Sequence, residues 1–157
     1  MKQIALDIDL GRGATLNNFL PGPNAEAFHH LRLWTGSDVR SPVPIYLWGP
    51  AGSGKTHLLR AVAQALAERG DTVGWLDASL AEPAPFDPRW RVILLDDVQA
   101  YSAVQQQAAF NWFVNAATPA GGAPCGVIAA GTQPPADLML REDLRTRLGW
   151  GHVFQLH

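Results

Sequence analysis

This sequence of 157 residues has little cysteine and no net positive charge, and each of these features excludes a class of protein. The single cysteine, Cys125, excludes an internal disulfide and a zinc site made of cysteines alone. A formal net charge of −2 and a pI near 6.2 argue against tight, charge-driven binding to nucleic acid. No apolar run approaches the ~20 residues of a membrane-spanning helix, and Asp7 and Asp9 interrupt the N-terminal stretch where a secretory signal would lie. These features predict a soluble, cytoplasmic protein with no membrane partner.

Apolar residues make up 47% of the chain, and they follow patterns typical of both strands and helices. Continuous apolar runs predict strands at 45–48, 72–76, 91–96, 126–130 and 152–156. Helical periodicity predicts helices from about residue 24, over 55–69, over 104–117 and near residue 136. This alternation predicts an α/β fold, a five-stranded, mainly parallel sheet with helices on both faces. Its ligand site is expected beyond the carboxyl ends of the strands.

Two segments carry more detailed expectations about the fold. In the helix over 104–117, the residues expected to form one apolar face are Phe110, Phe113, Val114 and Ala117. The segment 78–88 contains three prolines, so it is not expected to hold a long helix.

A phosphate-binding loop follows the first expected strand. The eight residues that fit the pattern G-x-x-x-x-G-K-[ST] are Gly49-Pro50-Ala51-Gly52-Ser53-Gly54-Lys55-Thr56. Glycines let backbone N–H groups turn toward phosphate oxygens, and the helix that begins at Lys55 adds its positive dipole end. Lys55 is expected to neutralise the β- and γ-phosphates, and Thr56 to offer its hydroxyl to Mg²⁺. The apolar strand before the loop and the amphipathic helix after it distinguish this motif from a simple glycine-rich turn.

Two carboxylates end the most apolar strand, Val92-Ile93-Leu94-Leu95-Asp96-Asp97. Carboxyl ends of parallel strands meet at one edge of the sheet, so Asp96 is expected beside the Mg²⁺ site, as in a Walker B element. Asp97 is then expected to polarise the attacking water. The alternative is an acidic strand end that is merely solvated. Because aspartate reaches less far than the glutamate of many P-loop enzymes, intrinsic hydrolysis is expected to be slow.

Three segments resemble the AAA+ core of the bacterial replication initiator DnaA and its relatives, at residues 46–49, 54–59 and 95–99. The resemblance implies a P-loop NTPase that binds ATP or ADP with Mg²⁺, and it adds His57 to the nucleotide-binding residues. Residues 16–24 resemble the segment that precedes this core and lines the adenine pocket. That similarity implies nucleotide contacts from Phe19, Leu20 and Pro21.

Two further motifs of the family have counterparts near the C-terminus. Gly131-Thr132-Gln133-Pro134-Pro135 resembles the sensor 1 region, although Thr132 and Gln133 stand where the family often has Asp-Arg. Residues 144–151 resemble box VII. By that resemblance Arg147 is an arginine finger, which would stabilise charge on the γ-phosphate of a neighbouring subunit's ATP.

The first residues resemble a clamp-binding peptide. Gln3-Ile4-Ala5-Leu6-Asp7-Ile8 is similar to the motif that begins the Hda group of this family, the regulatory inactivators of DnaA. The resemblance implies that Gln3, Leu6 and Ile8 occupy pockets on the sliding clamp, the β subunit of DNA polymerase. It divides the chain into a tail, 1–12, and an AAA+ core, 13–157. The implied function is a clamp-tethered regulator that promotes ATP hydrolysis by DnaA in trans and so inactivates the initiator.

Several alternatives stay open from the sequence. The runner-up functions are a helicase loader or initiator-like replication ATPase and, with less support, a small P-loop kinase. The chain ends near His157, where the family's helical lid follows, so a core without that lid is expected. The preference between ADP and ATP and any self-association are not determined by the motifs.

Overall fold

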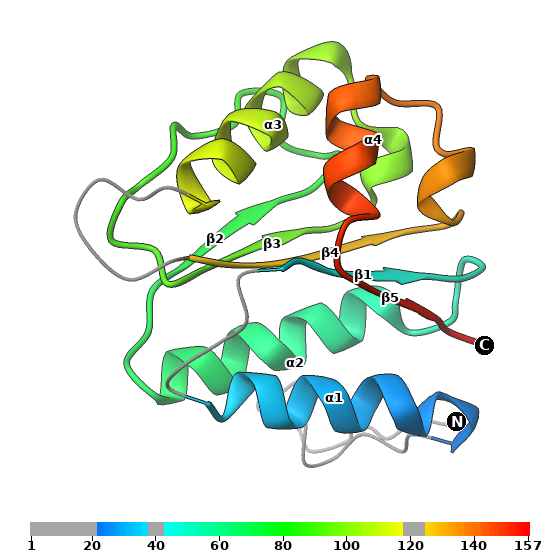
Figure 1. Ribbon diagram of the computed structural model, residues 1–157. Helices are drawn as coiled ribbons and strands as arrows, with labels where there is room; N and C mark the ends of the chain where they lie inside the picture. Colours follow the sequence, from blue (N-terminus) through cyan, green and yellow to red (C-terminus); the bar gives the residue numbers. More distant parts are fainter. Residues whose placement is uncertain (1–21, 38–42, 118–124) are drawn as a thin grey trace.

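A five-stranded parallel sheet forms the centre of the fold (Figure 1). The computed structural model describes residues 22–37, 43–117 and 125–157. The strands are β1 (Ile45–Trp48), β2 (Val73–Leu76), β3 (Val92–Leu95), β4 (Gly126–Gly131) and β5 (His152–Gln155). They lie in the order β2-β3-β4-β1-β5, and all four neighbouring pairs are parallel. The expected α/β sheet is confirmed.

Helices cover both faces of this sheet (Figure 1). On one face lie α1 (Ala25–Thr35) and α2 (Lys55–Glu68); on the other lie α3 (Ala103–Ala117) and α4 (Glu142–Leu148). Short 3-10 turns are η3 (Gly22–Asn24), η4 (Val98–Ala100) and η5 (Pro135–Asp137). None of the helices described combines the length and hydropathy that a membrane-spanning segment requires.

The two helical layers create two cores, because successive strand residues point to opposite faces of the sheet. Ile45 and Leu47 of β1 pack in the α1–α2 core, whereas Tyr46 between them packs in the α3–α4 core. All four residues of β3 are buried, as a central strand covered on both faces requires. A continuous apolar strand therefore contributes side chains to both cores.

The buried face of α3 differs from the one expected. Its buried residues are Gln105, Ala109, Trp112, Phe113 and Ala116. Of the expected face only Phe113 is among them; Val114 is 37% exposed and Phe110 is half-buried. The helix is apolar around most of its circumference, so periodicity left its rotation ambiguous.

Polar atoms on α3 find their partners in the long connection between β2 and β3. The Gln105 side-chain amide donates to the carbonyl oxygens of Ala78 and Leu80, each at 3.0 Å, and Trp112 Nε1 donates to Ala84 at 3.0 Å. These bonds join the buried face of α3 to the connection between β2 and β3, and they come from one polar and one largely apolar side chain.

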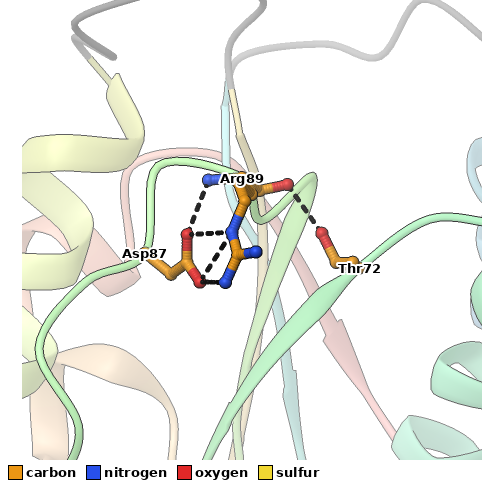
Figure 2. A network of polar contacts seen from close by, with 3 residues as sticks. All are labelled: Thr72, Asp87 and Arg89. Carbon is orange, nitrogen blue, oxygen red and sulfur yellow. Dashed lines mark hydrogen bonds and ion pairs between the residues drawn. The ribbon is translucent and has the colours of Figure 1, made fainter.

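The end of that connection is held by a small polar network (Figure 2). The guanidinium and backbone N–H of Arg89 both donate to the Asp87 carboxylate, while the Arg89 carbonyl accepts from the Thr72 hydroxyl at 2.6 Å. The residues between β2 and β3 contain no long helix, as the prolines predicted.

Candidate functional site

The phosphate-binding loop joins the carboxyl end of β1 to the first turn of α2. Gly52 and Gly54 have φ angles of 85° and 93°, in the left-handed region that side chains disfavour. The start of the loop is tied to β4, because the Gly49 N–H donates to the Gly131 carbonyl at 3.2 Å. Two glycines at positive φ therefore shape the loop between fixed ends.

Lys55 is held inside this loop and is only 7% exposed. Its Nζ donates to the carbonyl oxygens of Gly49 and Pro50 at 2.7 and 2.8 Å and to Ser53 Oγ at 3.2 Å. Burial lowers the pKa of Lys55, and the nearby carboxylates of Asp96 and Asp97 oppose that shift. The loop thus holds a desolvated cation where backbone N–H groups can converge on an anion.

Asp96 lies at the carboxyl end of β3 and contacts the phosphate loop directly. Its Oδ2 accepts from the Thr56 hydroxyl at 2.7 Å, and its Oδ1 accepts from the Asp97 N–H at 3.0 Å. Asp96 as a whole is 2% exposed, and this burial raises the pKa of its carboxyl. The structure therefore brings together the two residues that the sequence assigned to Mg²⁺.

A hydroxyl beside a carboxylate fits Mg²⁺, which prefers oxygen ligands in octahedral geometry. Within the described residues no group of three or more His, Cys, Asp or Glu could hold a metal ion. Thr56 and Asp96 would supply two ligands, so phosphate oxygens and waters would have to supply the rest.

Asp97 is the only non-glycine residue at positive φ in the described ranges, with φ at 55°. It precedes η4 and is half-buried beside Asp96. Such a backbone conformation costs energy unless the surroundings impose it, and it concentrates at functional sites. The turn directs the chain out of β3 and places Asp97 at the same edge of the sheet as the loop.

Gln99 links this edge to the expected sensor region, a role that the motif analysis missed. Its Oε1 accepts from the backbone N–H of Thr132 at 3.2 Å, so η4 after β3 is bonded to the residue that follows β4. The Tyr46 hydroxyl donates to the Gln133 carbonyl at 2.6 Å and holds the next residue. The sequence offered no signal for either bond beyond the position of these residues after or within strands.

Other expected site residues are not brought together by the described structure. His57 is exposed on the first turn of α2. The expected adenine contacts Phe19, Leu20 and Pro21, and the clamp motif of Gln3, Leu6 and Ile8, lie outside the described residues. Asn24, at the end of η3, pairs through its side-chain amide with the backbone N–H and carbonyl of His157, at 2.8 and 3.3 Å.

Arg147 lies in the last turn of α4, away from the phosphate loop. It lines a small hollow with Pro44 and Cys125, which precede β1 and β4, whereas the phosphate loop follows the opposite end of β1. Trp150 borders the same hollow and is 63% exposed. Across the described ranges, the Arg147 side chain makes no hydrogen bond or ion pair; it lies over the ring of Phe110 at 5.2 Å from the centroid.

Comparison with known proteins agrees with this geometry. Residues 10–77 match the model of the bacterial DnaA ATPase domain. An uncharacterised protein of Haemophilus influenzae is 32% identical over 163 residues, covering 99% of this chain and 69% of its own length. The chain belongs to the DnaA-like AAA+ ATPase family.

Solved structures share the fold of this DnaA-like chain. DnaA from Aquifex aeolicus with bound AMPPCP superposes with a TM-score of 0.77 at 24% identity, over 95% of this chain and 51% of that one. DnaI superposes with a TM-score of 0.65 at 16% identity, over 92% of this chain and 88% of DnaI. The chain spans about half the length of the DnaA structure. At these sequence identities the similarity shows a shared fold and nothing more.

Proposed function

We propose that this chain is a nucleotide-binding regulator of replication initiation that promotes ATP hydrolysis by DnaA. In this proposal ATP or ADP with Mg²⁺ occupies its own phosphate loop, and Arg147 completes the ATP site of DnaA in trans. A sliding clamp holds the regulator near replicating DNA through Gln3, Leu6 and Ile8. Hydrolysis would convert the initiator to an inactive state.

The observation that carries the proposal is the placement of Arg147. This side chain lies near the amino ends of β1 and β4, while the chain's own phosphate loop follows the carboxyl end of β1. A guanidinium with no hydrogen-bonded partner among the described residues retains its donors for an external anion. Both facts favour action on another subunit's nucleotide.

In the regulator's own site, Lys55 and the loop N–H groups would bind the β- and γ-phosphates. Thr56 and Asp96 would hold Mg²⁺, whose positive charge would offset the charge of the phosphates, and Asp97 would polarise a water near the γ-phosphate. The chain's own hydrolysis need not be fast, because a bound nucleotide can act as a structural ligand that stabilises the fold.

The decisive experiment measures ATP hydrolysis by DnaA in the presence of this chain, with Arg147→Ala as the variant and Arg145→Ala as the matched control. Arg145 lies on the same helix and donates to the Leu138 carbonyl at 3.3 Å. Arg147→Ala is expected to abolish stimulation while leaving nucleotide binding intact, because an arginine finger contributes about 10³-fold or more. Full stimulation by Arg147→Ala would reject the proposal.

The tether has a separate test. Clamp binding by Gln3→Ala is expected to fall well below that of the unaltered chain, with folding unchanged. Equal affinity of the two proteins for the clamp would reject the tether and leave the arginine finger unaffected.

A loader or initiator-like ATPase is the second candidate, because this chain covers 88% of the DnaI structure that it resembles. Such a protein would bind single-stranded DNA with affinity that falls steeply as salt increases. Salt-sensitive binding together with no effect on DnaA would favour this candidate.

A further inference from the structure

The ring of Phe110 on α3 lies beneath two arginine side chains, one from each end of α4. The Cζ atom of Arg141, which immediately precedes α4, lies 5.1 Å from the ring centroid. The Cζ atom of Arg147, in the last turn, lies 5.2 Å from it. Both distances fall within the ~6 Å over which a cation is attracted to an aromatic ring. One half-buried ring on α3 therefore contacts both flanking cations of the short helix.

The two arginines differ in their hydrogen bonds. Arg141 donates to the Gln107 side chain at 2.6 Å and to the Asp143 carboxylate at 2.7 Å. Arg147 has no such bond within the part of the chain that the structure describes; the charge of Asp143 acts on it without a hydrogen bond, and its guanidinium lies over the Phe110 ring. Removing the ring would leave Arg141 fixed by hydrogen bonds but would release Arg147.

A cation–π contact suits a residue that must be both positioned and available. It draws on the charge of the guanidinium and forms no hydrogen bond, so the N–H donors stay unused. A salt bridge would fix the same side chain by occupying those donors. The ring also restricts a long side chain that loses rotamer freedom when it binds, which reduces the entropic penalty of ordering it later.

We propose that Phe110 is a positioning residue for Arg147, holding the guanidinium at the α3–α4 surface with its donors free for a partner's phosphate. This inference rests on the proposed function, because it assumes that Arg147 acts on a nucleotide in trans. Phe110 itself touches no substrate. It raises the fraction of molecules in which Arg147 is oriented to act.

The test compares Phe110→Leu with Phe110→Tyr in the DnaA-stimulated hydrolysis assay. Leucine keeps apolar bulk without a π face and is expected to lower the maximal stimulated rate by about tenfold. Tyrosine keeps the ring and is expected to stay within about twofold of the unaltered chain. Phe110→Leu should add nothing in an Arg147→Ala background, because the two act through one guanidinium.

Phe28→Leu is the matched control, since Phe28 of α1 also lies under an arginine, with Arg32 Cζ 5.8 Å from its ring. The same substitution on the opposite face of the sheet should leave stimulation within about twofold, whatever it costs in stability. Equal losses in Phe28→Leu and Phe110→Leu would show that both act through stability and would overturn the inference.

A spectroscopic readout on the free chain keeps the inference falsifiable without DnaA. The ¹⁵N-detected Nε–H signal of Arg147 should carry an upfield ring-current shift that disappears in Phe110→Leu and persists in Phe110→Tyr. An unchanged signal in Phe110→Leu, or a stimulated rate equal to that of the unaltered chain, would overturn the role of Phe110 alone. Full stimulation by Arg147→Ala would instead overturn the proposed function and this role with it.

Discussion

Two cations, Lys55 and Arg147, lie near opposite ends of β1 and are held in opposite ways. At the carboxyl end of β1, Lys55 is 7% exposed and donates to three oxygens of its own loop. Near the amino end of the same strand, Arg147 is half-buried, lies over one ring and makes no hydrogen bond in the described ranges. Lys55 is therefore part of the chain's own phosphate site, whereas the guanidinium of Arg147 keeps its N–H donors available to another molecule.

Local chain geometry explains the contrast. The phosphate loop folds back on itself through positive-φ glycines, so its carbonyl groups surround Lys55 and satisfy it. Arg147 lies in the last turn of α4, where the negative end of the helix dipole favours a cation without requiring a bonded partner. Exposed Trp150 beside it gives that surface the aromatic and arginine composition common at protein interfaces.

The largest expected effect separates the two cations by nucleotide affinity. Lys55→Ala removes the charge at the phosphates and is expected to weaken ATP binding by roughly 10- to 100-fold. Arg147→Ala, the matched loss of a cation at the other end, should leave that affinity unchanged. Isothermal titration of each variant with ATP and Mg²⁺ measures the two affinities. Equal losses of ATP affinity would show that Lys55 and Arg147 do not have different roles in nucleotide binding.

The next effect concerns magnesium at the nucleotide end. Asp96→Asn is expected to reduce the Mg²⁺-dependent part of nucleotide affinity by roughly tenfold, because one charged oxygen ligand is lost. Burial raises the Asp96 pKa, so folding favours the protonated carboxyl, and its charge lowers stability at neutral pH. When both proteins are free of Mg²⁺, Asp96→Asn should therefore unfold at a higher temperature than the unaltered chain at pH 7. This difference in melting temperature should shrink as pH falls.

Exposed Asp137, on η5, provides the control for that experiment. Asp137→Asn is expected to change neither magnesium dependence nor melting temperature. A melting temperature lowered by Asp96→Asn would contradict the assignment of Asp96 as a buried, costly charge.

A smaller effect tests the link between η4 and the residue after β4. Gln99→Ala leaves the Thr132 N–H without its side-chain partner and should lower the free energy of unfolding by about 1 kcal/mol. Denaturant titration measures this change. Gln133→Ala, at an exposed position whose side chain makes no hydrogen bond in the described ranges, is the control with an expected change within about 0.5 kcal/mol. If Gln99→Ala left the free energy of unfolding unchanged, the bond between Gln99 and Thr132 would not stabilise the nucleotide-binding edge of the sheet.

The smallest effect is a pH dependence near the other end of the sheet, where β5 begins. His30 of α1 lies against His152 and Phe154, with ring centroids at 4.7 and 5.1 Å. Burial, then the charges of His152 and His29, lower the His30 pKa below 6.5. Its neutral form thus stabilises the fold above about pH 6.5, and this contribution is lost as pH falls through the lower, folded-state pKa.

Melting curves between pH 7.5 and 5.5 should therefore show a decline that is smaller in His30→Gln. Exposed His29 is the matched neighbour, and His29→Gln should retain most of the decline. A decline of equal size in all three proteins would assign it to other groups.

Much of the fold could be predicted because its signals are local. The apolar run that forms β3, the glycines of the phosphate loop and the prolines after β2 each act through their own backbone and immediate neighbours. The approach of Thr56 to Asp96 joins residues 40 apart, but it follows from the fold class, since the carboxyl ends of parallel strands converge at one edge of the sheet.

The rotation of α3 could not be predicted in this way. Its apolar residues surround the helix, and the choice of Trp112 and Gln105 for the buried face depends on carbonyl groups 25–28 residues away. The bond from Thr132 to Gln99 likewise joins residues 33 apart. Neither partner reveals the other by type or spacing.

The sequence by itself determined the sheet, its covering helices and the residues that can bind a phosphate, because short-range periodicity and backbone chemistry specify them. Only the tertiary structure decided that Lys55 is enclosed while Arg147 retains its donors beside Phe110. Whether a charged side chain is satisfied or available depends on which groups the whole fold brings near it, and that is a property of packing rather than of any motif.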